Sequence, residues 1–190
     1  MLKHPDKIIN SVIEMKKAID IPVSVKIRIL DNVGDTIDLC KKIEDAGVDF
    51  IIIHGRTIKQ RYSGKCNWET IKAVKEKIDI PIIGNGDIRY PFEGKRYVDR
   101  YYCNSYMIGR AAMSNPMLFS NKEPKDVEER FDLLEQYIEI YKEYIGTPEI
   151  ADIKVNALQI IRSTNNAAEI RNRICKTKDY QGIINFKEKN

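Results

Sequence analysis

Residues 51–64 read IIIHGRTIKQRYSG, which places polar side chains directly after an apolar run. The run of isoleucines is typical of a strand buried on both faces, and His54, Arg56, Arg61 and Tyr62 follow it. Guanidinium groups bind anions through strong, charge-assisted hydrogen bonds. This stretch is therefore either an ordinary solvated loop or the rim of an active site.

Three further apolar runs, at residues 21–29, 81–85 and 105–108, also carry residues suited to ligand binding. These residues are, in chain order, Lys26, Arg28, Gly84, Asn85, Gly86, Asp87, Gly109 and Arg110. In a parallel α/β fold, ligands bind at the carboxyl ends of the strands. Because all four runs contribute such residues at that one end, we expect one shared site there.

The glycines and cations in these runs indicate an anionic ligand. Gly84 and Gly86 flank Asn85, so backbone amides are expected to approach a ligand there. Arg110 stands where a helix is expected to begin, and the free N–H groups of a helix N-terminus beside an arginine suit a phosphate. Lys26 alternates with apolar neighbours and faces one side of a strand, where a lysine needs an anionic partner such as a reduced flavin.

Strand and helix patterns alternate along the part of the chain that carries these residues. Predicted strands cover residues 21–29, 49–53, 81–85 and 105–108. Predicted helices cover residues 8–19, 35–46, 68–78 and 91–100. Because each strand is followed by a helical pattern, the predicted architecture is α/β with parallel strands.

A different pattern, helical throughout, begins near residue 120. Apolar residues at steps of three and four predict helices over 123–145, 151–163 and 166–176. The tail from Lys178 is polar and is expected to fray. We therefore predict two domains, an α/β domain over residues 1–120 and a small all-helical domain over residues 121–190.

The composition is that of an ordinary soluble protein, with 43% hydrophobic and 32% charged residues among 190. No apolar run approaches the roughly 18 residues of a membrane helix, and no signal-peptide pattern is present, so we expect a cytoplasmic protein. The net charge of +4 is compatible with an RNA partner but does not indicate one. The cysteines form no CxxC pair, so free thiols and no metal site are predicted for Cys40, Cys66, Cys103 and Cys175.

Four motifs together resemble the tRNA-dihydrouridine synthases. They are Val25-Lys-Ile-Arg28, His54-Gly-Arg-Thr57 with Gln60-Arg-Tyr-Ser-Gly64, Asn85-Gly-Asp87, and Met107-Ile-Gly-Arg-Ala111 with Asn115-Pro116 and Phe119. The second motif is the most specific, because the others recur in flavin barrels generally. The resemblance is strong over about residues 1–120, and in the helical region Lys154 and Arg171 are its sequence hints.

Members of that family reduce the C5–C6 double bond of a uridine in tRNA, with FMN as the cofactor and NADPH or NADH as the reductant. The resemblance implies that the cofactor is held by Lys26, His54, Asn85, Gly86, Asp87, Gly109 and Arg110. It implies that the tRNA faces Arg28, Arg56, Arg61, Tyr62, Lys154 and Arg171. The target uridine would be flipped out of its stack to reach the cofactor.

The sequence departs from the family pattern in its number of strands. A full barrel has eight strands, and the strands predicted here resemble the last four. The acid that protonates uridine C5 is a cysteine of the first half, and no cysteine here has that context, so no catalytic residue is assigned. We expect the C-terminal half of a (β/α)₈ TIM barrel, either a fragment or a half that pairs with another chain, and no uridine reduction by this chain alone.

Two other functions stay open on the sequence alone. One is an FMN-dependent oxidoreductase that acts on a small metabolite, against which the helical region argues. The other is a non-catalytic tRNA-binding remnant that uses the basic residues of the helical region. Such a remnant would bind RNA in a salt-sensitive manner without flavin.

Overall fold

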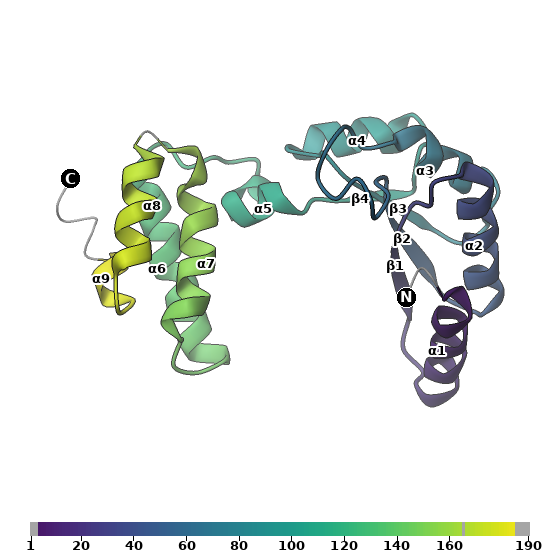
Figure 1. Ribbon diagram of the computed structural model, residues 1–190, viewed down its shortest axis with the longest axis horizontal. Coiled ribbons are helices and arrows are strands. Elements are labelled where there is room, and N and C mark those ends of the chain that lie inside the picture. The colour runs from purple at the N-terminus through teal and green to yellow at the C-terminus, as the bar shows by residue number, and fades with distance from the viewer. Residues whose placement is uncertain (1–3, 165, 185–190) are drawn as a thin grey trace. The chain divides into compact units, whose positions relative to one another are not determined.

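The computed structural model describes residues 4–164 and 166–184, and the chain divides into two compact units between Gly109 and Arg110. The first unit contains α1 (Pro5–Ala18), β1 (Ser24–Arg28), α2 (Val33–Asp45), β2 (Phe50–His54), α3 (Trp68–Lys75), β3 (Ile82–Asn85), α4 (Pro91–Asp99) and β4 (Ser105–Met107) (Figure 1). The second unit contains α5 (Arg110–Ser114), η1 (Pro116–Ser120), α6 (Val127–Tyr144), α7 (Ile150–Ile160), η2 (Ile161–Ser163), α8 (Ala167–Lys176) and α9 (Gln181–Ile184).

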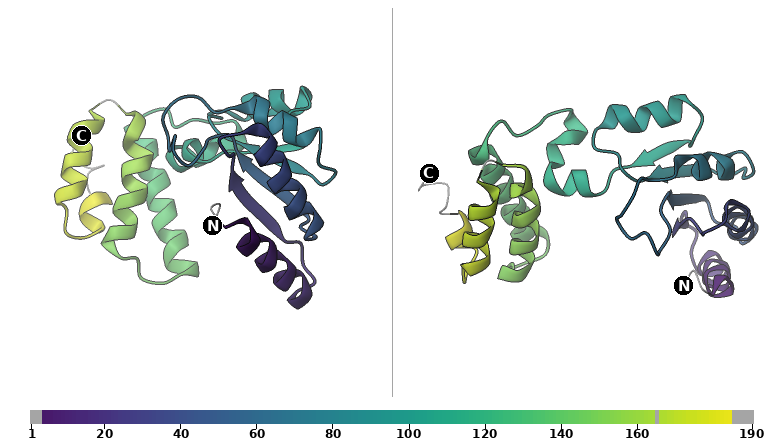
Figure 2. Two further views of the ribbon diagram at one scale, coloured as in Figure 1. Left: turned by 45° about the vertical axis from the view of Figure 1, so that its right-hand side comes forward. Right: turned by 45° about the horizontal axis from the view of Figure 1, so that its top comes forward.

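The four strands form one parallel sheet in the order β1-β2-β3-β4. Sequential order with right-handed crossovers places the connecting helices on a single face of the sheet. Figures 1 and 2 show α2 and α3 on the same side of the strands. The prediction of an α/β architecture with parallel strands is therefore confirmed.

The strand register decides which side chains enter the core of the first unit. Ile27, Ile51, Ile53 and Ile82 are at most 4% exposed and pack with apolar residues of α1, α2 and α3. The residues between them point to the opposite face, where Lys26, Ile52, Ile83 and Ser105 occupy aligned positions. That row lies outside the core cluster, and we call this side of the sheet the open face.

Local sequence sets the helix ends in the first unit. Asn32 accepts a hydrogen bond from the N–H of Gly34 at 2.7 Å, and Asn67 accepts one from Thr70 at 3.0 Å. These are N-cap interactions, and they fix where α2 and α3 begin. Gly47, with a φ of +89°, follows the end of α2 as its sequence predicts.

The second unit is built around the apolar faces of α6, α7 and α8. Phe131, Leu134 and Ile138 of α6 are at most 1% exposed and pack against Ile153 of α7 and other residues of the same cluster. No helix in the described part of the chain is both long and apolar enough to cross a membrane.

Two expectations about the second unit differ from the structure. The division between the units precedes Arg110 rather than falling near residue 120, because α5 packs against α7. The expectation of a frayed tail from Lys178 is wrong for α9, since Ile183 is fully buried in the second core. The part of the tail from residue 185 onward lies outside the described residues.

Candidate functional site

The carboxyl ends of the strands bring one row of side chains together on the open face. Aligned positions on β1 to β4 are occupied by Arg28, His54, Asn85 and Met107. Lys26 lies one row deeper, next to Ile52. The structure thus places Lys26, Arg28, His54 and Asn85, which are separated by up to about sixty positions in the chain, at one edge of one sheet.

Burial and nearby positive charges together determine the protonation of His54. Burial, and then the charges of Arg28, Lys26 and Arg56, lower the pKa of His54 to about 4, although Asp87 opposes the shift. Burial also lowers the pKa of Lys26, and Arg28 adds to that effect. His54 is therefore neutral at pH 7, and the cations around it create a positive field that favours an anionic ligand.

Arg56 turns into the protein, where only 2% of the residue is exposed. Its Nη2 donates to Asp87 Oδ2 at 2.8 Å and to the carbonyl of Gly64 at 2.7 Å. Its Nη1 lies 2.8 Å from Asp87 Oδ1 as an ion pair. Asp87 also accepts from the N–H of Cys66 at 2.8 Å. Arg56 was expected to face tRNA, but it holds the β2–α3 loop (residues 55–67) against the end of β3.

Arg28 holds the same loop from the β1 side. Its Nη1 donates to the carbonyls of Thr57 and Arg61, each at 3.0 Å. Its guanidinium also lies 5.8 Å from the ring centroid of Tyr62. The side chain of Arg28 is thus engaged with the loop, whereas Arg61 and Tyr62 are exposed at its outer end.

Trp68 and Cys66 are parts of this edge that the sequence analysis did not assign. A Cβ added at Gly84 would lie 2.3 Å from the Trp68 ring, and one added at Gly86 would lie 2.4 Å from Cys66 Sγ. The indole N–H of Trp68 donates to the carbonyl of Gly86 at 3.2 Å, and the ring stacks on Tyr97. The two glycines therefore leave room for the neighbouring side chains of Trp68 and Cys66. The available signal was the single tryptophan of the chain, which follows shortly after the motif that ends at Gly64.

Cys66 is a poor proton donor despite its position. Burial, and then the charge of Asp87, raise the pKa of its thiol to about 12, so it stays neutral at pH 7.

Among residues 4–164 and 166–184, no group of three or more His, Cys, Asp and Glu side chains is arranged to hold a metal ion.

The remaining predicted residues are outside the strands β1–β4. Gly109 ends the first unit, and Arg110 begins α5, a helix of five residues. Lys154 of α7 donates to the carbonyl of Cys175 at 2.9 Å, near the end of α8. Arg171 is exposed, and its Nε donates to a carbonyl one turn earlier in α8 at 3.0 Å.

The sequence of this chain is similar to those of several named proteins. A probable tRNA-dihydrouridine synthase of Aquifex aeolicus (strain VF5) is 33% identical over 184 residues, which are 94% of this chain and 58% of that protein. The tRNA-dihydrouridine synthase B of Salmonella typhimurium is 36% identical over 121 residues, which are 63% of this chain and 38% of that protein. The chain therefore spans little more than half the length of the Aquifex aeolicus protein.

A solved structure of mandelate oxidase aligns with a TM-score of 0.40 and 14% identity over 93% of this chain and 58% of that one. The family described as dihydrouridine synthase (Dus) matches residues 1–189. That match takes in both units and all of the motifs at the strand ends. The chain belongs to the dihydrouridine synthase family.

Proposed function

We propose that this chain forms the C-terminal half of the catalytic barrel, with its helical domain, of an FMN-dependent tRNA-dihydrouridine synthase. The observation that carries the proposal is the group of cations, Lys26 and Arg28 among them, around a neutral His54 at the strand ends. Membership of the family supports it independently. The sequential parallel sheet, with its helices on one face, is the arrangement that half of a (β/α)₈ barrel requires.

The side chains on the open face suit a planar, anionic cofactor. Ile52 and Ile83 offer apolar contact for a ring, and Lys26 places a positive charge beside them. FMN, when bound, would supply the hydride that reduces a uridine, with NADPH or NADH as the source of electrons. We assign to its binding Lys26, His54, Asn85, Gly86, Gly109 and Arg110.

The structure suggests a distinct task for several of these side chains. Lys26 would balance negative charge on the cofactor, and the neutral His54 would offer a hydrogen bond without repelling the cations beside it. Asn85 Nδ2 donates to the carbonyl of Met107 at 2.8 Å, which fixes the orientation of its amide. Asp87, expected to line the cofactor path, is assigned instead to holding Arg56.

We also propose that another segment or chain covers the open face and completes the barrel. Within the described residues, β1 and β4 are edge strands, and Ser24 and Lys26 are exposed beside the apolar Ile52. Open strand edges are a liability that proteins normally cover. On this proposal, the group that protonates uridine C5 also comes from the covering part.

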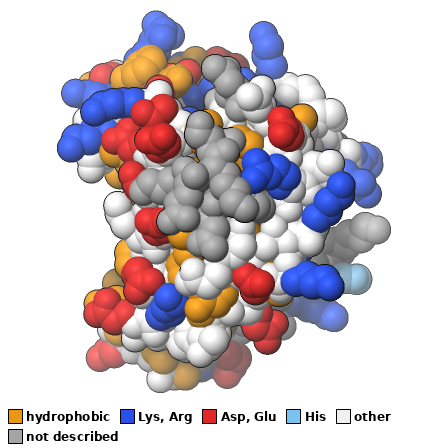
Figure 3. Space-filling view, turned by 90° about the vertical axis from the view of Figure 1, so that its left-hand side faces the viewer, with side chains coloured by type: hydrophobic (Ala, Val, Ile, Leu, Met, Phe, Trp, Pro, Cys, Tyr) orange, Lys and Arg blue, Asp and Glu red, His pale blue; other side chains and the backbone are white. Residues whose placement is uncertain are grey.

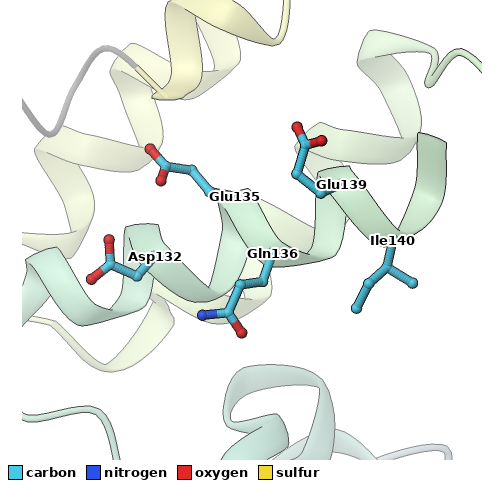
Figure 4. A pocket seen from close by; sticks show the side chains of 5 residues that line it. All are labelled: Asp132, Glu135, Gln136, Glu139 and Ile140. Carbon is cyan, nitrogen blue, oxygen red and sulfur yellow. The ribbon is translucent and has the colours of Figure 1, made fainter. Parts of the chain in front are cut away.

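For the tRNA we propose contacts with the exposed Arg61 and Tyr62 of the β2–α3 loop and with Lys154 and Arg171 of the helical unit. Lys and Arg side chains are interspersed with Asp and Glu on the face in Figure 3. A hollow of about 530 Å³ along α6 is lined by Asp132, Glu135, Gln136, Glu139 and Ile140 (Figure 4). Because carboxylates repel phosphates, this face of α6 is unsuited to RNA.

The test is a visible absorbance spectrum of the purified chain before and after FMN is added. We expect a bound-flavin spectrum near one FMN per chain, and no dihydrouridine when NADPH and unmodified tRNA are supplied. A chain that stays colourless at high FMN concentration would contradict the cofactor assignment. Dihydrouridine formed by the chain alone would contradict the half-barrel assignment, and reduction of a small metabolite would favour the alternative flavin enzyme.

A further inference from the structure

We propose that the outer face of α4 is a stacking platform for an unpaired nucleotide of an RNA. The platform, which we call the α4 patch, consists of Arg89, Tyr90, Phe92, Lys95, Arg96 and Arg100. It is distinct from the cofactor row and from the tRNA contacts proposed above. The inference deepens the proposed function, on which the choice of RNA as the partner rests.

The two aromatic side chains of the patch lie against each other on the surface. Tyr90 is 42% exposed and Phe92 is 59% exposed. Their ring centroids are 5.6 Å apart, and their planes differ by 11°. Large exposed apolar groups that cluster are a signal of interaction, and a flat stacked pair matches the face of a nucleobase.

Helix geometry gathers the basic side chains beside these rings. Phe92, Lys95, Arg96 and Arg100 fall at steps of three and four, which places them on one face of the helix. All of them are exposed. The opposite face packs on the sheet: a Cβ at Gly94 would lie 2.3 Å from the ring of Tyr106, so the helix must approach β4 closely.

The charge of the patch complements a phosphate backbone. Within the described residues, none of its four cations forms an ion pair within 4.0 Å. Glu93 lies among them, but its carboxylate accepts from the N–H groups of Arg89 and Tyr90 at 2.7 and 3.1 Å. Asp99 is the remaining acidic side chain on this helix, and it is exposed.

Topology places the rings at the same end of the sheet as the cofactor row. Tyr90 immediately precedes α4, in the loop that leaves the carboxyl end of β3. That end carries Asn85 and, on the neighbouring strand, His54. A nucleotide stacked on Tyr90 and Phe92 would therefore lie at the rim of the end of the sheet where the reaction is proposed.

The test compares the full chain with the double variant Tyr90→Ser/Phe92→Ser, using a labelled oligouridylate and a fully paired RNA duplex in fluorescence anisotropy. Removing a stacking platform should weaken oligouridylate binding roughly tenfold and leave duplex binding nearly unchanged. Tyr144→Ser is the matched control, because Tyr144 is 76% exposed on the acidic α6 and should not contribute. Circular dichroism checks that each variant is folded.

A second variant, Lys95→Gln/Arg96→Gln, separates charge from stacking. It should reduce the slope of log affinity against log salt concentration by about 1.4 if both cations meet phosphates of a single strand. Equal oligouridylate affinity for the chain and Tyr90→Ser/Phe92→Ser would overturn the inference, as would equal losses for single-stranded and paired RNA. An FMN titration of the same samples distinguishes the two proposals. If the chain binds FMN but substitutions in the α4 patch do not change RNA affinity, only this inference is overturned. If the substitutions weaken RNA binding but the chain binds no FMN, only the cofactor assignment is overturned.

Discussion

The polar side chains at the strand ends form two groups. We call Arg28, Arg56 and Asp87, which bind the β2–α3 loop, the braced side, and we call Lys26 and His54 the open side. On the braced side, Arg28 and Arg56 direct their guanidinium groups into the β2–α3 loop, and Asp87 completes the network. On the open side, Lys26 is exposed, and His54, which is 9% exposed, lies outside the apolar core cluster. On the proposed assignment, one cluster of cations contains both the groups that face the ligand and the groups that support them.

The braced side explains how an exposed loop can carry a defined site. Ion-pair and hydrogen-bond contacts join the loop to β1 and to the turn after β3, so three strand ends are fixed relative to one another. Preorganisation of this kind lowers the cost of ordering a site when a ligand binds.

The largest effect is expected from Arg56→Ala. The substitution removes a buried side chain together with its charge-assisted hydrogen bonds to Asp87 and to the carbonyl of Gly64, and it should lower the free energy of unfolding by about 4 kcal/mol. Urea denaturation measures the change. Lys59→Ala is the matched control, because Lys59 and Asp31 form an exposed pair that should contribute little. Equal stability of the two variants would contradict a bracing role for Arg56.

Gly86→Ala should destabilise the chain by about 3 kcal/mol, since it combines a steric clash with an unfavourable backbone conformation. The new methyl group would lie 2.4 Å from Cys66 Sγ, at a φ of +133°. Gly109→Ala is the matched control for unfolding, because its Cβ would have no neighbour within 4 Å. A Gly86→Ala chain as stable as Gly109→Ala would show that the turn relaxes freely.

The low pKa of His54 should make the stability of the chain depend on pH. The folded pKa of His54 is about 4 and the ordinary value is 6.5, so the unfolded chain binds the proton more readily. Stability is then complete above about pH 6.5 and falls by about 2 kcal/mol as the pH drops to 4, after allowance for screening at the open face. Unfolding measured across this range should show the loss, and His54→Gln should reduce it. An unchanged profile in that variant would place the titration elsewhere.

Trp68→Phe should have the smallest effect, about 1 kcal/mol, because the aromatic ring can still stack on Tyr97 while the hydrogen bond to Gly86 is lost. Thermal unfolding, monitored by circular dichroism, measures it. Trp68→Leu, which also removes the stacking partner, should cost clearly more. If both variants lose the same stability, the hydrogen bond and not the ring would be the dominant contribution.

The fold of the first unit could be predicted from sequence because its signals are local. Runs such as Ile51-Ile-Ile53 and the step of apolar residues in α3 identify elements, and their alternation identifies a parallel sheet. The ends of elements were less accurate, since β1 starts at Ser24, after Pro22, rather than at residue 21. The packing of Ile183 depends on distant residues of α6, and a polar local sequence hides it.

The location of the candidate site could be predicted from the sequence, but the contacts of its individual side chains could not. That the strand ends would converge follows from the parallel arrangement alone. The contact of Arg56 with Asp87 joins residues 31 positions apart, and local sequence does not reveal it. The pairing of Trp68 with Gly84 likewise joins residues from different elements, and only the packed structure shows it.

The most direct test of the comparison is the affinity for FMN of the chain and of Lys26→Gln, measured by flavin fluorescence together with the free energy of unfolding. Lys26 lies on the open side and contributes nothing to the brace. The substitution should therefore weaken FMN binding about tenfold and leave stability unchanged, as expected for one lost charge-assisted contact. Unchanged FMN affinity, or a loss of stability like that of Arg56→Ala, would contradict the assignment of the open side to the cofactor.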